Sequence, residues 1–443
     1  MKLLIFGGTI VNEGQKFRGS VIIEDDRIKE VFKGEDTLSQ NDFDKVINAT
    51  DCIVMPGVID EHVHFREPGL TEKADIDSES KAAAFGGVTS YFDMPNTIPQ
   101  TTTIENLNQK FELARQKSHI NYGFFFGATN SNYSNLKDID KHRIPGIKLF
   151  MGASTGNMLV DKYASLLHIF ETASSIGLPI MVHCEDSETI NANMDRMRKT
   201  YGDDPPVILH PAIRSEEACF ESSALAAQLA KTFNTRLHIA HISTAREIHL
   251  LGRNITGEAV VAHLLFDTND YTTKGALIKC NPSIKTSNDR DTLLDAVNRG
   301  IISTIATDHA PHLLSQKQGG CYKAASGMPS IQFSLVSMLE LSDKGLFSIE
   351  RIVECMCHAP ARIFEVRDRG FLSPGMKADI TIVRRQETPW IVEDEMVVSK
   401  CKWSPMSGMS FHWKVEHTIC NGKHVYDKGV FNNNIHGEEI EFR

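Results

Sequence analysis

Short β-type runs alternate with longer helical stretches through the middle of the chain, and this alternation restricts the fold more than any other feature. One intervening helix is clear, because the stretch 215–233 opens with Ser215 as an N-cap and carries an apolar stripe. Eight strands separated by helices predict a TIM-type (β/α)8 barrel, an α/β fold. The eight runs span residues 57–65, 87–94, 121–129, 146–151, 178–185, 236–243, 258–266 and 301–310.

The two ends of the chain have a different pattern, made of short β-rich segments. These lie at 3–11, 20–32 and 45–55 in the first part, and at 378–385, 395–400 and 417–426 in the last part. We expect the two ends to pair into one small β domain. Its N-terminal part is then 1–55, the barrel is 56–365, and its C-terminal part is 366–443.

Composition excludes several classes of protein. Hydrophobic residues make up 41% of the 443 residues, which is enough for a large core and argues against a disordered chain. The net charge is 47 − 57 = −10, the wrong sign for a general binder of nucleic acid or of anionic membranes. No apolar stretch approaches the ~18 residues of a membrane span, and we interpret the N-terminus as a strand rather than a signal peptide.

The nine cysteines are scattered and odd in number. Cys355 and Cys357 are close, but their spacing suits neither a zinc ribbon nor a redox pair. Free, mostly buried thiols in a reducing cytosol are the simplest interpretation, so we expect a cytoplasmic protein.

Polar side chains recur at the ends of the predicted strands, where the active sites of such barrels lie. The first run ends in His62-Val63-His64, and residues i and i+2 of a strand point to the same side. His183, His241 and Asp308 end later runs. Together they form the nitrogen and oxygen ligand set that Zn²⁺ prefers.

Lys148 lies inside an apolar run that should be buried. Desolvation favours its neutral amine, which can react with CO2 to give a carbamate, an anionic ligand able to bridge two metal ions. The alternative is a structural lysine paired with an acid such as Asp308, and the bare sequence does not decide between them.

Three strings, at 56–69 (PGVIDEHVHFREPG), 93–97 (DMPNT) and 307–312 (TDHAPH), closely resemble dihydroorotases of the cyclic amidohydrolase superfamily. The layout of terminal β segments around a barrel is similar to that superfamily along nearly the whole chain. The resemblance implies that the metal ligands are His62, His64, Lys148, His183, His241 and Asp308. It further implies that Lys148 is N6-carboxylated and that one or two Zn²⁺ are bound per chain.

The same resemblance assigns the substrate side of the site. Asp308 would also move the catalytic proton. Arg66, Asn96 and His312 look like the clamp for a substrate carboxylate, while Asn281 and Gly327 resemble further substrate contacts. Taken alone, Arg66 is more typical of a surface pair with Glu67, and the sequence geometry does not choose between His309 and His312.

Two departures from the family pattern stand out. Many bacterial relatives with the FREPG string have an aspartate at the bridging position, where this chain has Lys148, so the number of metal ions stays open. Many relatives also have a Pro-His-His-Leu string, where this chain has Val261-Ala262-His263-Leu264. We therefore interpret His263 as structural.

The implied reaction is the reversible cyclisation of N-carbamoyl-L-aspartate to (S)-dihydroorotate and water, in de novo synthesis of the pyrimidine nucleotide UMP. Two rivals stay open. One is a dihydropyrimidinase or allantoinase, which share the metal site but act on rings without the carboxylate. The other is an inactive dihydroorotase-like scaffold. A homodimer and an association with aspartate transcarbamoylase are open alternatives to a free monomer.

Overall fold

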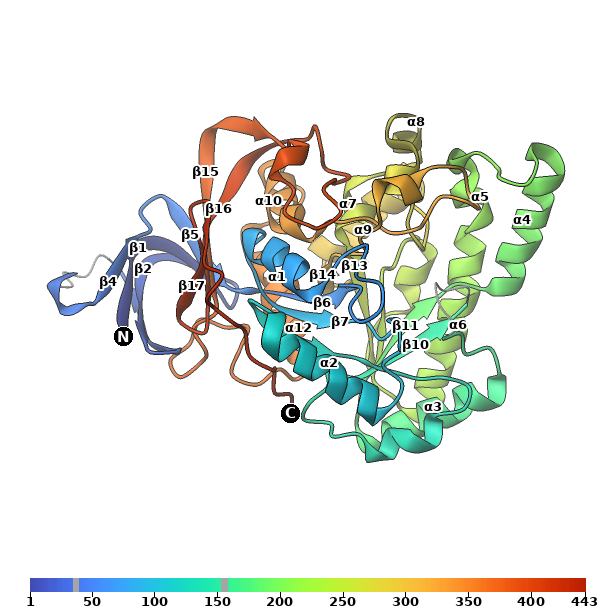
Figure 1. The fold of residues 1–443 in the computed structure, drawn as a ribbon, viewed down its shortest axis with the longest axis horizontal. Coiled ribbons are helices and arrows are strands. Elements are labelled where there is room, and N and C mark those ends of the chain that lie inside the picture. The colour runs from blue at the N-terminus through green and yellow to red at the C-terminus, as the bar shows by residue number, and fades with distance from the viewer. Residues whose placement is uncertain (35–39, 153–157) are drawn as a thin grey trace.

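The central part of the chain folds into a barrel of parallel strands, in a computed structural model that describes residues 1–34, 40–152 and 158–443. Two sheets form it, ordered β6-β7-β8 and β14-β13-β12-β11-β10-β9, and a bridge between Val63 and His309 links them. The predicted (β/α)8 barrel is confirmed (Figure 1). Its strands are β6 (Val58–Val63), β7 (Val88–Asp93), β8 (Asn121–Phe124), β9 (Phe126–Gly127), β10 (Ile147–Met151), β11 (Ile180–Cys184), β12 (Leu237–Ile239), β13 (Ile255–Val260) and β14 (Thr304–Ala306).

The connections between strands depart from a regular alternation. The Ser215 hydroxyl accepts a hydrogen bond from Ala218 N, and the predicted helix is confirmed as α6 (Glu216–Phe233). After β9 and β12 the chain forms 3₁₀ helices, η2 (Tyr133–Asp138) and η4 (Arg246–Leu250), in place of α-helices. The run at 258–266 is only half strand, because β13 ends at Val260 and α7 (Val261–Leu265) follows directly.

The remaining α-helices surround the barrel or cap its ends. They are α1 (Ile76–Phe85), α2 (Ile104–Lys117), α3 (Tyr163–Ile176), α4 (Ser187–Tyr201), α5 (His210–Ile213), α8 (Tyr271–Lys274), α9 (Ser287–Asn298), α10 (Ser334–Asp343), α11 (Ile349–Val353) and α12 (Ala359–Ile363).

The two ends of the chain pair in one nine-stranded sheet, as expected. Strand β5 lies at the junction: it runs parallel to β1 and antiparallel to β15, so blue and red strands lie side by side in Figure 1. The segment 395–400, predicted as a strand, is not one; it begins in η10 (Asp394–Met396) and continues as a loop. The strands are β1 (Lys2–Asn12), β2 (Gln15–Glu24), β3 (Arg27–Lys33), β4 (Lys45–Asn48), β5 (Cys52–Pro56), β15 (Ile380–Ile391), β16 (Ser410–Cys420), β17 (Lys423–Asp427) and β18 (Val430–Phe431).

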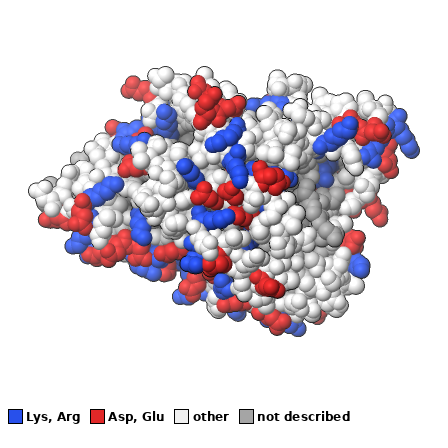
Figure 2. Space-filling view, viewed as in Figure 1, with Lys and Arg blue, Asp and Glu red and all other residues white. Residues whose placement is uncertain are grey.

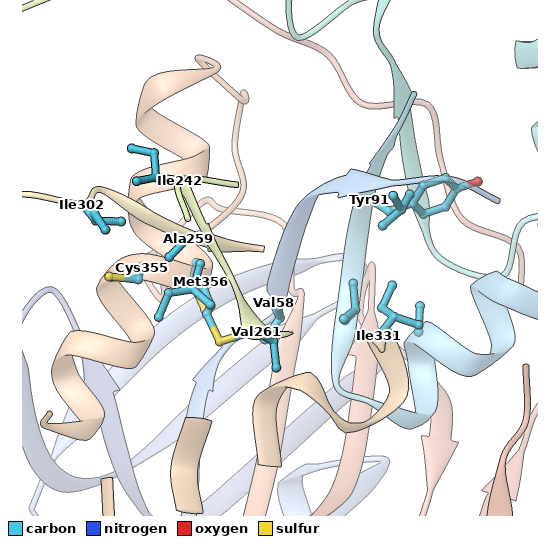
Figure 3. Packing of buried hydrophobic residues seen from close by; sticks show 14 of the residues in the cluster. Val58, Tyr91, Ile242, Ala259, Val261, Ile302, Ile331, Cys355 and Met356 are labelled. Carbon is cyan, nitrogen blue, oxygen red and sulfur yellow. The ribbon is translucent and has the colours of Figure 1, made fainter. Parts of the chain in front are cut away.

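Apolar packing joins the barrel strands to the segment that follows α11. The segment η9 (Glu354–His358) contacts β6 and β14, and Figure 3 shows its Cys355 and Met356 near Val58 and Ala259. All four side chains are buried, and burying a large apolar side chain stabilises a fold by about 1.5–3 kcal/mol.

Charges of both signs are interspersed on the face shown in Figure 2. Among the described residues, no helix combines the length and apolar character that crossing a bilayer requires. All nine cysteines are free and buried, as the scattered spacing predicted.

Candidate metal centre and substrate pocket

Three of the predicted metal ligands converge at the strand ends of β6 and β14. Nε2 of His64 lies 3.0 Å, and Nε2 of His62 3.4 Å, from Oδ1 of Asp308. Their ligand atoms lie within 4.8 Å of one another, close enough to bind one ion. Burial raises the pKa of Asp308, but the two histidines and Lys148 lower it further, so the net pKa is well below that of an ordinary aspartate.

The other two predicted histidine ligands meet beside this group. Nδ1 of His183, on β11, lies 2.9 Å from Nε2 of His241, which follows β12. The ring centroids of His62 and His241 are 5.3 Å apart, so the two pairs are neighbours. Burial lowers the pKa of His62 to about 3, which keeps its ring neutral and its lone pair free for a metal ion.

Acceptors on the far side of the rings turn two of these histidines toward the common centre, and a carboxylate lies near a third. Glu258 Oε1 accepts a hydrogen bond from His62 Nδ1 at 2.8 Å, and Asn96 Oδ1 accepts one from His64 Nδ1 at 2.8 Å. Glu185 Oε2 lies 3.2 Å from His183 Nε2. Such partners fix which nitrogen carries the proton in metal sites. The residues therefore fit a bound divalent ion.

Lys148 lies on β10 and is fully buried. Its Nζ has no hydrogen-bond partner among the described residues. Burial lowers its pKa to about 8, although the charges of Glu258 and Asp308 oppose this. Among the described residues, Lys148 Nζ forms no ion pair with Asp308. The structure therefore does not show the alternative, a structural lysine paired directly with that acid. An unpartnered buried amine fits the predicted carbamate chemistry.

A pocket opens above the histidines, and four predicted substrate residues line it: Arg66, Asn96, Asn281 and Gly327. Oδ1 of Asn281 lies 3.2 Å from His210 Nε2. Gly327 has a φ of +128°, and a Cβ there would meet the Ala310 carbonyl oxygen at 2.7 Å. Only glycine fits this wall without strain.

The guanidinium of Arg66 is buried at the edge of the pocket. Its Nε donates to the Pro311 carbonyl at 3.0 Å, and its Nη2 lies 3.1 Å from His312 Nε2. Burial, followed by the charge of Arg66, lowers the pKa of His312 to about 2, so its ring is neutral. Arg66 and His312 thus form one cationic group facing the metal ligands.

A family model described as the amidohydrolase family matches residues 53–425 of this chain. The chain belongs to the amidohydrolase family. Membership of this family agrees with a barrel that has histidines and an aspartate at its strand ends. It supports the prediction that the protein is an enzyme, a cyclic amidohydrolase.

Individual amidohydrolases similar to this chain include enzymes for different rings. A dihydroorotase from Methanosphaera stadtmanae is 31% identical over 88% of this chain and 89% of its own length. An allantoinase from Bacillus velezensis is 30% identical over 96% of this chain and 94% of its own length. The L-hydantoinase (dihydropyrimidinase) structure from Arthrobacter aurescens has a TM-score of 0.94 at 25% identity, and covers 100% of this chain and 99% of its own. The resemblance to dihydroorotases is confirmed.

Several ambiguous residues of this amidohydrolase have clear partners. Glu67 pairs with Lys117 and accepts from Ile76 N, so a surface pair of Arg66 with Glu67 is wrong. His309 faces away from the pocket, with Nε2 2.7 Å from Glu79 Oε2. His263 lies against the Pro282 carbonyl oxygen at 3.1 Å, in agreement with a structural role.

Sequence reasoning missed Glu258 and Glu185, which hold the ligand histidines from behind. Glu258 also accepts from the His241 backbone N at 2.9 Å, so one carboxylate orients residues on two strands. Both are charged residues in or beside buried strands. Because charged side chains are rarely buried without a partner, their position in apolar runs could have indicated a role at the site. Burial raises the pKa of Glu185, but the opposing charge of Arg214 brings it to about 2.

Proposed function

We propose that the chain is a dihydroorotase, interconverting N-carbamoyl-L-aspartate and (S)-dihydroorotate in de novo UMP synthesis. The observation that carries this proposal is the buried Arg66, which lines the same pocket as the ligand histidines and Asp308. A buried cation needs an anionic partner, and a substrate carboxylate is one. Rings that lack a carboxylate would leave this charge uncompensated.

We further propose that one or two Zn²⁺ bind at this centre and that Lys148 is N6-carboxylated. His62, His64 and Asp308 would hold one ion, His183 and His241 a second, and Lys148 would lie between them. When bound, zinc would lower the pKa of water toward ~7 and polarise the amide carbonyl.

The side chains of the chain itself then have distinct tasks. Asp308 is ionised, because its neighbours hold its pKa low, and it takes the proton of the attacking water and returns it to the leaving ring nitrogen. Arg66 and His312 bind the carboxylate, with the amide group of Asn96 beside them. Asn281 and the backbone at Gly327, which also line the pocket, contact the ring.

A hydantoinase-type or allantoinase-type activity is the second candidate, favoured by the allantoinase relative and by the match to the hydantoinase fold. An assay of zinc-loaded protein with dihydroorotate, dihydrouracil and allantoin side by side separates the two. Preference for dihydroorotate supports the proposal, and preference for either other ring contradicts it. No turnover of any ring would favour the inactive scaffold, although the chain has all six candidate ligands.

The cellular setting is also a proposal: a cytoplasmic enzyme, as a homodimer or in association with aspartate transcarbamoylase. Light scattering of the purified chain, alone and with that transcarbamoylase, would test both assemblies.

A further inference from the structure

Lys317 ends the short 3₁₀ helix η7 (Leu314–Lys317), which follows the strand end that carries Asp308. Its side chain is buried, with 2% of the residue exposed. Nζ donates to three backbone carbonyl oxygens: that of Lys279 at 3.0 Å, of Ala325 at 2.8 Å and of Gly327 at 2.7 Å. An ammonium group has three N–H donors, so each one has an acceptor.

These carbonyls belong to two segments that form one wall of the pocket. The first segment, 279–281, ends in Asn281, and the second, 324–327, ends in Gly327. Further bonds cross between them: Gly327 N donates to the Lys279 carbonyl at 2.9 Å, and Lys279 Nζ donates to the Ala324 carbonyl. The Lys317 ammonium lies at the point where the two segments meet.

Lys317 also contacts an aromatic ring that supports the backbone of His312. Its Nζ lies 5.7 Å from the ring centre of Trp403, within the range of a cation–π contact. Nε1 of Trp403 donates to the His312 carbonyl oxygen at 2.8 Å. One buried cation therefore touches or supports the backbone of Gly327, the segment before Asn281, and the residue that supports His312.

We propose that Lys317 is a positioning residue, which sets the pocket wall formed by Asn281, Ser326 and Gly327 and thereby the affinity for the substrate ring. This proposal rests on the proposed function only in taking a cyclic amide as the occupant. Lys317 never touches the reacting atoms; it acts through the backbone that lines the pocket.

The loop that carries this wall has a second, independent anchor. Asp204, after α4, accepts hydrogen bonds from the backbone N–H groups of Gly320, Tyr322 and Lys323 at 2.8–3.0 Å. This anchor lies at the outer part of the loop, and Asp204 does not line the pocket. Asp204 therefore provides a matched control: it holds the same loop, but not the wall.

The test compares Lys317→Met with Asp204→Asn in the zinc-loaded enzyme. Methionine keeps the length of the side chain and removes all three donors. We expect Lys317→Met to raise KM about tenfold, the scale of a lost charged hydrogen bond, while kcat stays within about threefold and zinc content is unchanged. Asp204→Asn should leave KM within about twofold. A KM near wild type in Lys317→Met, or an equal rise in Asp204→Asn, would overturn the proposal.

Hydrogen exchange of the backbone gives a readout without substrate. Lys317→Met should speed exchange in peptides covering 279–281 and 324–327, and unchanged exchange there would contradict the proposal.

If Lys317→Met does not fold, Lys279→Met, which removes the bond to Ala324, should raise KM in the same direction; an unchanged KM overturns the inference. If another cyclic amide is the substrate, the proposed function fails, but the KM comparison is made with that amide and still decides the role of Lys317.

Discussion

Asn96 Oδ1 accepts a hydrogen bond from Nδ1 of His64 at 2.8 Å. The side chain predicted to bind the substrate carboxylate thus also fixes a metal ligand, because the bond leaves Nε2 of His64 turned toward Asp308. Asn96 also lines the pocket. One residue connects the metal centre to the substrate clamp.

Asn96→Ala should therefore weaken metal binding as well as substrate binding. We expect zinc affinity to fall by about 10- to 100-fold, the usual effect of losing a partner behind a ligand histidine. Zinc retained after dialysis against a graded chelator measures this. Asn96→Asp keeps the acceptor and places a negative charge at the pocket, so it should retain zinc and lose dihydroorotate affinity. Equal zinc retention in the alanine variant and the wild type would refute the link.

Lys148→Ala should abolish activity. If the carbamate forms, the variant loses a bridging ligand, and we expect at least about a 10³-fold fall in kcat, equivalent to several kcal/mol. Lys148→Arg keeps a positive charge but cannot form the carbamate, and it should be equally inactive. Incorporation of labelled bicarbonate, followed by carbon NMR, should give a carbamate signal only in the wild type. Near-normal turnover by either variant would exclude the bridge.

Arg66→Ala should damage the handling of dihydroorotate more than that of rings without a carboxylate. Losing the partner of a charged group costs about 2–3 kcal/mol, so kcat/KM should fall about 30- to 150-fold. The control is dihydrouracil, whose residual turnover should change little in the same variant. The clamp is wrong if both substrates lose activity to the same extent.

His263 should make the stability of the protein depend on pH. Burial, followed by the charge of Lys285, lowers its pKa to about 4 from the ordinary 6.5. The unfolded chain therefore takes up a proton below pH 6.5 that the folded chain does not accept until about pH 4. The free energy of unfolding should fall by about 3 kcal/mol across this window as the pH decreases.

His263→Gln should reduce that slope, as measured by urea unfolding at a series of pH values. His249, which is exposed, provides the control, and His249→Asn should leave the pH dependence unchanged. Identical slopes in the wild type and His263→Gln would contradict this assignment.

Much of the fold follows from local patterns. Strand-to-helix alternation predicts the barrel, because parallel strands need helical crossovers, and strand-end histidines predict where the metal ligands gather. The segment 395–400 shows the limit: its β-branched residues favour a strand, but it has no partner strand and packs as a loop near Gln332, which binds Val398 N at 2.8 Å.

The residues that hydrogen-bond to the ligand histidines were harder to predict from the sequence. Glu258 lies 196 residues from His62 and Asn96 lies 32 from His64, and no local rule pairs residues at such separations. The contacts of Lys317 could not be predicted either. Its three acceptors are backbone carbonyl oxygens, which every residue type has.

The sheet shared by both ends has a consequence for biosynthesis. Strand β5 leaves the ribosome before its neighbour β15, which begins at Ile380, more than three hundred residues later. Until β15 has been translated, the nascent chain therefore exposes an unpaired β edge, a known template for aggregation. Yield in a heterologous host should depend on elongation speed and on chaperones that shield this edge.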